Sequence, residues 1–121
     1  MKPTRVLIVD DNPAARRLLR IACEANGAEV EDCADAAAAE AVLLLRRFDL
    51  MLIDCYMPGT DGRTLARRVR AAGHPGRLVA ATADALLPAT DPEGMRVFDA
   101  VLIKPILMDT IRAELARLAA T

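Results

Sequence analysis

Aromatic residues are scarce in this sequence. It has no Trp, one Tyr and two Phe, so aromatics make up 2% of the chain. Proteins that bind single-stranded nucleic acids stack the bases on aromatic side chains, and this chain has few to offer. Its net charge of −1 provides no general positive field for a phosphate backbone, although arginines gather at Arg16, Arg17, Arg20 and at Arg67, Arg68, Arg70. We expect no nucleic-acid binding by this chain.

Long apolar runs and cysteine motifs are also missing. No segment approaches the roughly 20 apolar residues that cross a bilayer, and the basic residues 1–5 lack the features of a signal peptide. Cys23, Cys33 and Cys55 are odd in number and lack Cys-x-x-Cys spacing, which favours reduced thiols without a catalytic role. These absences predict a cytoplasmic chain that makes no membrane contact itself.

What the sequence has in quantity is apolar residues, which make up 54% of its 121 positions. This length can bury one sizeable core, so we expect a single domain over residues 1–121. Short apolar runs alternate with segments of helical periodicity. The expected strands are residues 5–9, 28–33, 49–53, 78–81 and 100–103. The expected helices are residues 13–26, with Leu18, Leu19 and Ala22 facing inward, residues 35–47 with Asp35 as the cap, residues 62–72 and residues 109–119.

Five strand–helix units with apolar strands predict an α/β fold in which helices cover both faces of a parallel sheet. Such sheets carry their functional groups at the carboxyl ends of the strands. Polar residues stand at four of these ends, namely Asp10 and Asp11 after the first strand, Asp54 after the third, Thr82 after the fourth and Lys104 after the fifth. We therefore expect these side chains to meet at one edge of the sheet.

The chemistry of these side chains predicts a metal site. Asp10, Asp11 and Asp54 would repel one another unless a cation neutralised them. An all-oxygen set of ligands suits Mg²⁺, which keeps several waters and leaves room for a phosphate oxygen. Lys104, one of only two lysines, and Thr82 are suited to hold phosphoryl oxygens. The combination favours attack of Asp54 on a phosphorus atom, which gives an aspartyl phosphate.

In these residues the chain resembles the receiver domains of two-component response regulators. The resemblance covers nearly the whole sequence through Asp10-Asp11, Asp54 with Met57-Pro58 and Asp61-Gly62, Thr82-Ala83 and Lys104-Pro105. It implies a flavodoxin-like (βα)5 domain with strand order 2-1-3-4-5. It also implies a phosphorelay in which Asp54 accepts a phosphoryl group from a phosphohistidine.

The resemblance further implies a role for each matching residue. Asp11, Asp54 and the backbone carbonyl of Tyr56 would bind Mg²⁺, and Asp10 would contribute through water. Thr82 and Lys104 would bind the phosphoryl group. The Lys104–Pro105 peptide bond would be cis, an isomer that only proline tolerates cheaply.

A finer resemblance is to the receivers of hybrid sensor histidine kinases of the Bvg/Evg type. It rests on Asp11-Asn12-Pro13, the run from Asp54-Cys55 to Met57-Pro58-Gly59, residues 65–70 and Lys104-Pro105-Ile106. It implies that the partners are a histidine kinase domain and a histidine phosphotransfer domain, and that the chain is the cytoplasmic part of an inner-membrane kinase. The alternatives are a stand-alone regulator that signals by conformational change and a degenerate receiver that only binds proteins. Whether a switch that assists its own phosphorylation and dephosphorylation counts as an enzyme stays open.

The chain departs from the family at two places. Val101 stands three residues before Lys104, where the family usually has a Tyr or Phe whose ring moves inward when the threonine engages the phosphate. Pro88 and Pro92 are poorly compatible with a helix interior, so we expect a fourth helix that is short or broken, beginning at Asp91 with Pro92 in its first turn. Since that face is a common dimer surface in the family, we expect a monomer.

Several residues also have simpler interpretations. Asp10-Asp11 could merely cap the following helix, and Asp61-Gly62 is interpreted as a turn and a helix cap. Tyr56 could shield an acyl phosphate or simply pack. His74 lies in a Gly/Pro loop and is expected to be solvated, so a phosphohistidine must come from another domain or protein. The residues Arg16, Arg17 and Arg20 are expected to form a hydrated helix face.

Another class of protein also phosphorylates an aspartate. Phosphatases and mutases of the haloacid dehalogenase type place Asp-x-Asp directly after the first strand. This chain has Asp10-Asp11-Asn12 at that point, which does not fit. A nucleotide-binding fold is disfavoured as well, because no glycine-rich phosphate-binding loop follows the first strand.

Overall fold

The computed structural model describes residues 2–119; residues 1, 120 and 121 of the expected domain lie outside the described part. Within it, five strands form one parallel sheet in the order β2-β1-β3-β4-β5, which confirms the expected fold. The strands are β1 (Arg5–Val9), β2 (Glu29–Cys33), β3 (Leu50–Asp54), β4 (Arg77–Thr82) and β5 (Ala100–Ile103). The helices are α1 (Pro13–Ala25), α2 (Ala36–Leu43), α3 (Gly62–Ala71), α4 (Leu87–Thr90), α5 (Pro92–Met95) and α6 (Met108–Ala119).

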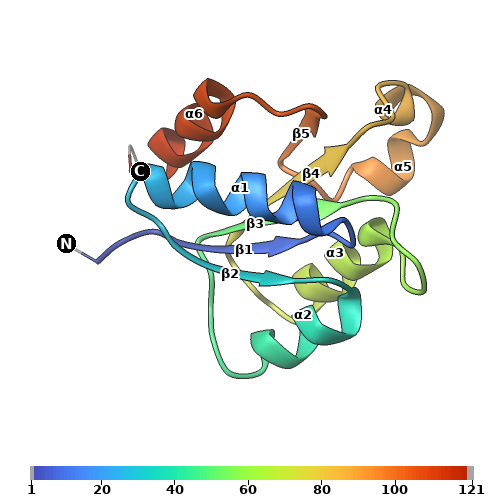
Figure 1. Ribbon diagram of the computed structural model, residues 1–121. Helices are drawn as coiled ribbons and strands as arrows, with labels where there is room; N and C mark the ends of the chain where they lie inside the picture. Colours follow the sequence, from blue (N-terminus) through green and yellow to red (C-terminus); the bar gives the residue numbers. More distant parts are fainter. Residues whose placement is uncertain (1, 120–121) are drawn as a thin grey trace.

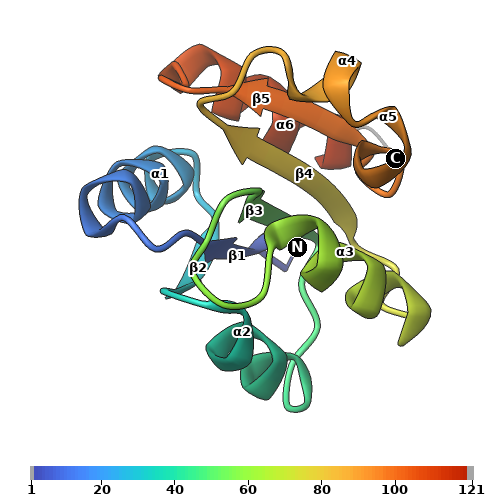
Figure 2. The same cartoon turned by 90° about the vertical axis from the view of Figure 1, so that its right-hand side faces the viewer.

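Helices cover both faces of the sheet (Figures 1 and 2). On one face, α1 and α6 enclose an apolar cluster that includes Leu19, Cys23 and Ile111. On the other face, α2, α3 and α5 enclose a second cluster, which includes Cys33 and Cys55. All three cysteines are free and buried. Every residue of the central strand β3 is buried, and this double coverage explains why its sequence is a continuous apolar run.

None of the helices within residues 2–119 is long and apolar enough to cross a membrane.

The buried face of α1 differs from the expected one. Leu18, which we expected to face inward, is 68% exposed, whereas Leu19, Ala22 and Cys23 are buried. The positions 19, 22 and 23 follow the helical spacing of three and four residues and share one face, whereas Leu18 lies about 100° around the helix from Leu19, at the edge of that face. The choice between the two adjacent leucines depends on what the opposite side of the helix must contact.

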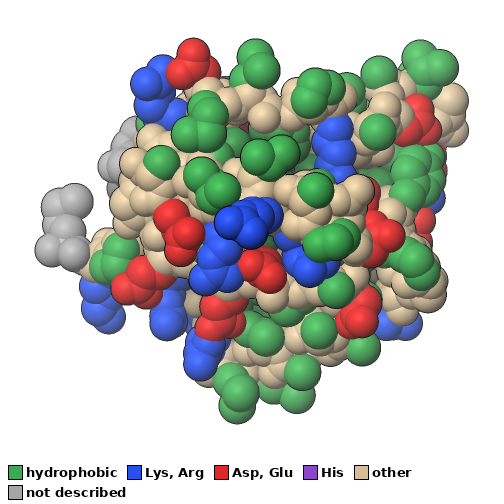
Figure 3. Space-filling model, in the orientation of Figure 1, with side chains coloured by type: hydrophobic (Ala, Val, Ile, Leu, Met, Phe, Trp, Pro, Cys, Tyr) green, Lys and Arg blue, Asp and Glu red, His purple; other side chains and the backbone are tan. Residues whose placement is uncertain are grey.

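Charged contacts to β2 account for that rotation of α1, and they leave Arg16 and Arg20 only partly exposed, whereas a hydrated face is expected from the sequence. Arg20 donates hydrogen bonds to Asp32 Oδ2 at 2.7 Å and to the backbone carbonyl of Val30 at 3.1 Å. Arg16 Nε lies 3.5 Å from Asp32 Oδ1. Arg17 is exposed, as expected. Basic and acidic side chains lie next to each other on the surface over α1 and β2 (Figure 3), so the described residues form no extended positive patch in this view.

Helix α2 ends at Leu43, and the expectation that it reaches residue 47 is wrong. Leu44 and Leu45 are 87% and 82% exposed, so burial gives no reason to extend the helix through them. Phe48 is buried in the cluster beneath α2 and α3. Because Phe48 lies two residues before β3, the chain must leave the helix early to bring that ring into the core, and this tertiary demand outweighs local helix propensity. Asp35 caps the start of α2 as expected, with its carboxylate accepting from the Ala38 N–H at 2.8 Å.

The expected break in the fourth helix is confirmed. Two short helices, α4 and α5, stand between β4 and β5, each of four residues with a proline in its first turn. Asp91 separates them, and its side chain caps α5 by accepting from the Gly94 N–H at 3.0 Å. Leu87 and Met95 are buried and tie the two short helices to the core.

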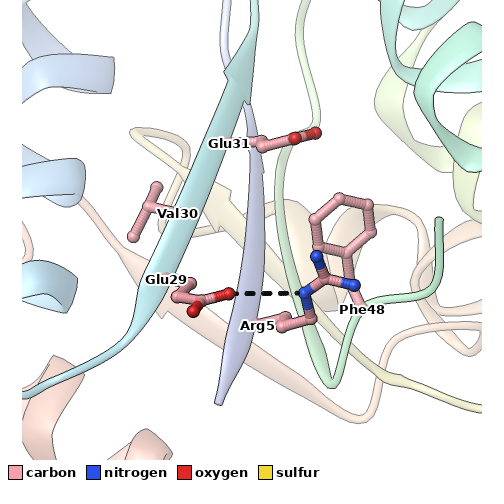
Figure 4. A pocket seen from close by; sticks show the side chains of 5 residues that line it. All are labelled: Arg5, Glu29, Val30, Glu31 and Phe48. Atoms are coloured by element: carbon pink, nitrogen blue, oxygen red, sulfur yellow. Dashed lines mark ion pairs between the residues drawn. The ribbon is translucent and has the colours of Figure 1, made fainter. Parts of the chain in front are cut away.

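A hollow of about 140 Å³ opens beside the edge strand β2 and is shown in Figure 4. Its lining includes Arg5 and Glu29, whose charged groups lie 3.6 Å apart and are about half exposed, so their pairing contributes little stability. Another hollow, of about 370 Å³, lies between α2 and α3. None of the polar residues at the carboxyl ends of the strands lines either hollow.

Candidate functional site

The register of the sheet brings the polar strand ends together. Val9 lies opposite Ile53, and Asp54 lies opposite Ala81. On the far side of β4, Thr82 lies opposite Ile103. The residues Asp10, Asp54, Thr82 and Lys104 therefore stand at the same edge of the sheet, as the sequence predicts.

Three carboxylates form an acidic cluster at this edge. One oxygen from each of Asp10, Asp11 and Asp54 lies within 4.8 Å of the others. Asp10 and Asp54 are buried, whereas Asp11 is exposed. The backbone N–H of Asn12 donates to Asp10 Oδ1 at 2.9 Å, and that of Tyr56 donates to Asp54 Oδ1 at 3.2 Å. Each buried carboxylate is thus oriented by the N–H two residues further along, and its second oxygen faces Lys104.

Helix capping does not account for the pair Asp10-Asp11. Asn12 caps α1, and its side-chain oxygen accepts from the N–H groups of Ala14 at 2.9 Å and Ala15 at 3.1 Å. Arg16 donates to the backbone carbonyl of Asp10 at 2.9 Å and so fixes the chain just before the helix. The simpler capping interpretation of Asp10-Asp11 is therefore wrong.

Lys104 supplies the positive charge of the cluster. Its ammonium group lies 2.7 Å from Asp10 Oδ2 and 3.7 Å from Asp54 Oδ2. The backbone N–H of Lys104 donates to the carbonyl of Thr82 at 2.8 Å, which joins the ends of β4 and β5. The Lys104–Pro105 peptide bond is cis.

Asp54 has an altered acidity in this setting. Burial raises the pKa of its carboxyl from 3.8 to about 6, and the positive charge of Lys104 opposes this shift. The negative charge of Asp10 raises the pKa of Asp54 further. One ammonium group therefore does not fully offset the cost of ionising Asp54 beside two other acids.

The donor set fits a divalent cation. It consists of carboxylate oxygens at mutual distances that one ion can span, and Lys104 is the ammonium group that contacts the carboxylates of Asp10 and Asp54. Hard oxygen ligands of this kind suit Mg²⁺ or Ca²⁺ better than softer metals. The residues Asp10, Asp11 and Asp54 could hold such an ion.

Thr82 lies fully buried at the end of β4. Its hydroxyl oxygen accepts a hydrogen bond from the backbone N–H of Asp84 at 3.0 Å. The hydroxyl proton itself is not committed by that contact, so Thr82 retains a donor that could be directed toward a bound anion.

Tyr56 does not pack into the core, because 48% of it is exposed. Its hydroxyl donates to Asp84 Oδ2 at 2.8 Å. The guanidinium of Arg63 lies over the Tyr56 ring, 5.3 Å from its centroid. Neither Asp84 nor Arg63 was expected at the site from the sequence. A signal for Asp84 was present, because Tyr56 and Asp84 each stand two residues beyond the ends of two paired parallel strands.

Asp61 is a cap, as expected. Its carboxylate accepts from the backbone N–H of Arg63 at 2.7 Å and from the Arg63 side chain at 2.9 and 2.7 Å. This pairing lowers the pKa of Asp61. Val101 is partly buried and packs against the apolar cluster beneath α2, α3 and α5.

Comparison with known families identifies one match. The response regulator receiver domain family matches residues 6–116. Over 111 residues the chain is 33% identical to the sensor histidine kinase RcsC of Salmonella typhimurium, an alignment that covers 92% of this chain and 12% of that protein. Over 123 residues it is 37% identical to the virulence sensor protein BvgS of Bordetella bronchiseptica, covering 96% of this chain and 10% of that protein. The chain thus spans about a tenth of the length of these relatives.

A solved structure of similar fold is the receiver domain of the sensor histidine kinase PA1611 from Pseudomonas aeruginosa PAO1. It superposes with a TM-score of 0.87 at 24% identity, with 99% of this chain and 100% of that chain covered. That structure has a magnesium ion coordinated in its active site cleft.

Proposed function

Because the chain belongs to the response regulator receiver domain family, we propose that residues 1–121 form a receiver domain that accepts a phosphoryl group on Asp54. The observation that carries this proposal is the cluster of Asp10, Asp11 and Asp54 within 4.8 Å, with Lys104 beside it. Asp54 is the candidate nucleophile because it ends the buried central strand, which holds its carboxylate in one place.

The reaction that suits these residues is transfer from a phosphohistidine of another domain. An oxygen of ionised Asp54 attacks the phosphorus atom in line with the phosphorus–nitrogen bond. That bond breaks, its electron pair stays on the imidazole nitrogen, and an acyl phosphate forms on Asp54. The attacking oxygen carries no proton in the ionised carboxylate, so the chain needs no general base there.

In this proposal the acidic cluster is the Mg²⁺-binding site. Asp11, Asp54 and the backbone carbonyl of Tyr56 would hold the ion, and Asp10 would contribute through water. When bound, Mg²⁺ supplies positive charge that offsets the charge developing on the phosphoryl oxygens. Lys104 is within reach of Asp54, and Thr82 has a hydroxyl proton to donate, so these two residues bind the remaining oxygens.

The relatives favour a hybrid-kinase context. RcsC and BvgS are both named as sensor proteins. Each is several times longer than this chain, which matches only a small part of it. We infer that a histidine kinase domain donates the phosphoryl group and that a histidine phosphotransfer domain can receive it. In this proposal the chain acts as a monomer on the cytoplasmic side of the inner membrane and binds no nucleic acid. The mixing of opposite charges over α1 and β2 supports the last point (Figure 3).

Phosphorylation by a small donor tests the proposal directly. The protein is incubated with Mg²⁺ and acetyl phosphate, and its intact mass is measured. We expect an increase by one phosphoryl group in the wild type and none in Asp54→Asn. Asp61→Asn is the matched control because Asp61 is a nearby acid that caps α3, and it should still gain the group. An unchanged wild-type mass, or an equal gain in Asp54→Asn, would overturn the assignment.

A second experiment separates the hybrid-kinase context from that of a stand-alone regulator. The phosphorylated chain is mixed with a histidine phosphotransfer domain, and phosphate on both proteins is followed over time. Rapid transfer, at least ten times faster than loss to water, supports the relay. If phosphate is lost only to water while Asp54 is phosphorylated normally, the stand-alone regulator replaces the relay.

A further inference from the structure

Val101 stands where this family usually has a Tyr or Phe whose ring moves inward when the threonine engages the phosphate. Val101 is paired with Ala80 across β4 and β5 and packs against the apolar cluster beneath α2, α3 and α5. A valine has one side-chain torsion and no ring that could move between a buried and an exposed position. A change at Thr82 must therefore reach the surface by another physical connection.

The first step of such a connection is the hydrogen bond between Thr82 and Asp84. Thr82 Oγ1 accepts from the backbone N–H of Asp84 at 3.0 Å in the structure. A Thr82 side chain that turns toward a phosphoryl oxygen on Asp54 carries its lone pairs with it, away from the Asp84 N–H. Binding of Thr82 to the phosphoryl group thus weakens its bond to Asp84 and releases the backbone there.

The second step joins Asp84 to Tyr56. The Tyr56 hydroxyl donates to Asp84 Oδ2 at 2.8 Å, while Asp84 Oδ1 accepts from the Leu86 N–H at 3.0 Å. Both carboxylate oxygens are occupied, so the carboxylate moves with its own backbone. The bond is charge-assisted and connects the loop after β3 to the loop after β4. A displaced Asp84 therefore pulls on Tyr56 or releases it.

The third step leads from Tyr56 to α5. The guanidinium of Arg63 stacks over the Tyr56 ring and donates to Asp91 Oδ2 at 2.8 Å. Asp91 Oδ1 accepts from the Gly94 N–H in the first turn of α5. Arg63 thus contacts the Tyr56 ring on one side and the cap of α5 on the other. Since α5 has only four residues, its geometry depends on this cap more than that of a long helix would.

We propose that this connection, here named the Tyr56 relay, carries the phosphorylation state of Asp54 to the first turn of α5. The relay consists of Thr82, Asp84, Tyr56, Arg63 and Asp91. The inference rests on the proposed function, because it requires a phosphoryl group that Thr82 can bind. It adds a route from the site to the first turn of α5 for a chain in which the usual ring is absent.

The test compares the two ends of the relay in solution. Beryllofluoride with Mg²⁺ serves as the phosphoryl analogue, and amide chemical shifts of Thr82 and Gly94 are followed by NMR. In the wild type we expect both amides to shift. In Tyr56→Phe and in Asp84→Ala, which cut the same bond from opposite sides, we expect the Gly94 shift to fall at least threefold while the Thr82 shift persists. The double variant should lose no more than either single variant.

Matched controls and a second signal make the outcome decisive. Arg112→Gln changes an exposed ion pair with Asp109 in α6, outside the relay, and should leave both shifts as in the wild type. Tyr56 is the only tyrosine in a chain without tryptophan, so intrinsic fluorescence reports this residue alone. Beryllofluoride should change that fluorescence in the wild type and not in Asp84→Ala.

Each remaining outcome has a definite meaning. If Thr82 does not respond in the wild type, the proposed function fails and the relay fails with it. If Thr82 responds while Gly94 does not in the wild type, or if the Gly94 shift in both single variants is as large as in the wild type, the relay is overturned and the proposed function stands. Loss of the Thr82 response in Asp84→Ala would also overturn the relay, because it would place Asp84 within the phosphoryl site.

Discussion

Lys104 Nζ lies 2.7 Å from Asp10 Oδ2, although the two residues are 94 positions apart in the sequence. The contact places a cation from the last strand beside a fully buried acid from the first, and Lys104 is also 3.7 Å from Asp54. The same ammonium group lowers the pKa of Asp54. This contact therefore couples the stability of the domain to the chemistry of its site.

Replacing Lys104 tests that coupling. In Lys104→Gln the buried Asp10 loses its ion-pair partner, and the pKa of Asp54 should rise above about 6 because Lys104 is the positive charge that opposes the shift. We expect the free energy of unfolding without divalent ions to fall by about 3 kcal/mol. Added Mg²⁺ should restore more stability to this variant than to the wild type, because the ion replaces the missing charge. Urea unfolding monitored by circular dichroism measures both effects.

The other lysine provides the control for this experiment. Lys2 is exposed, so Lys2→Gln should change the free energy of unfolding by less than about 0.5 kcal/mol. Equal effects of the two substitutions would show that the ion pair at the site contributes nothing specific.

The raised pKa of Asp54 makes a prediction about pH. Between its ordinary pKa of 3.8 and its folded value of about 6, the native state binds this proton more tightly than the unfolded state. The contribution of Asp54 to stability is therefore present below pH 3.8 and is lost as the pH rises through about 6. Asp54→Asn removes the group that ionises, so the variant does not lose this stability as the pH rises. Without divalent ions at pH 7, the variant should be more stable than the wild type by on the order of 3 kcal/mol.

Asp61 should show the opposite sign, which makes it the control for pH. Arg63 lowers the pKa of Asp61, so this acid stabilises the fold above its ordinary pKa and loses that contribution as the pH falls. Asp61→Asn should therefore be less stable than the wild type at neutral pH, and the difference should shrink in acid. Parallel pH profiles for the two variants would contradict both assignments.

Gly62 allows a close backbone approach to Asp54. A Cβ at this position would clash with the backbone carbonyl oxygen of Asp54, so Gly62→Ala must push the two segments apart. We expect a loss of about 3 kcal/mol in the free energy of unfolding, with weaker Mg²⁺ binding because Asp54 moves. Thermal unfolding and calorimetric titration with Mg²⁺ provide the measurements.

A second glycine, in the loop just before α3, separates steric clash from backbone strain. Gly59 has a φ of +78°, and a methyl group added there would meet no other atom of the described residues within 4 Å, so Gly59→Ala has strain without a clash. It should cost about 1 kcal/mol and leave Mg²⁺ binding near the wild-type value. If both variants behave alike, contact with Asp54 is not the reason for Gly62.

The broken fourth helix should be visible in hydrogen exchange. Residues 84–95 contain two four-residue helices held mainly by Leu87 and Met95, whereas all of β3 is buried in the sheet. We expect amides in residues 84–95 to exchange through local opening, roughly a hundredfold or more faster than those of β3. Uniform strong protection across both segments would contradict this expectation.

The position of the site could be predicted because it follows from the sheet. Once the strands are assigned as parallel, their carboxyl ends must share an edge, and this rule places Asp10, Asp54, Thr82 and Lys104 together without any knowledge of side-chain geometry. The break at Pro92 could be predicted for a similar reason, since proline restricts the backbone locally.

Features that depend on contacts between distant segments could not be predicted. The rotation of α1 that exposes Leu18 follows from contacts of Arg16 and Arg20 with Asp32, and the early end of α2 follows from burial of Phe48. Periodicity within a helix does not contain this information. The bond between Tyr56 and Asp84 joins two loops, whose conformations are set by the rest of the fold.

The buried cysteines can report when the folded chain opens, because each becomes reactive only when it is exposed. Cys23 lies on the buried side of α1, whereas Cys33 and Cys55 lie on the other face of the sheet, and Cys55 directly follows Asp54. Burial raises the pKa of Cys23 to about 11 and that of Cys55 to about 12, so alkylating reagents find neither an accessible sulfur nor a thiolate in the folded chain. Mass spectrometry of alkylated peptides would therefore time the exposure of each face separately, and at Cys55 it would do so one residue from Asp54, the proposed phosphoacceptor.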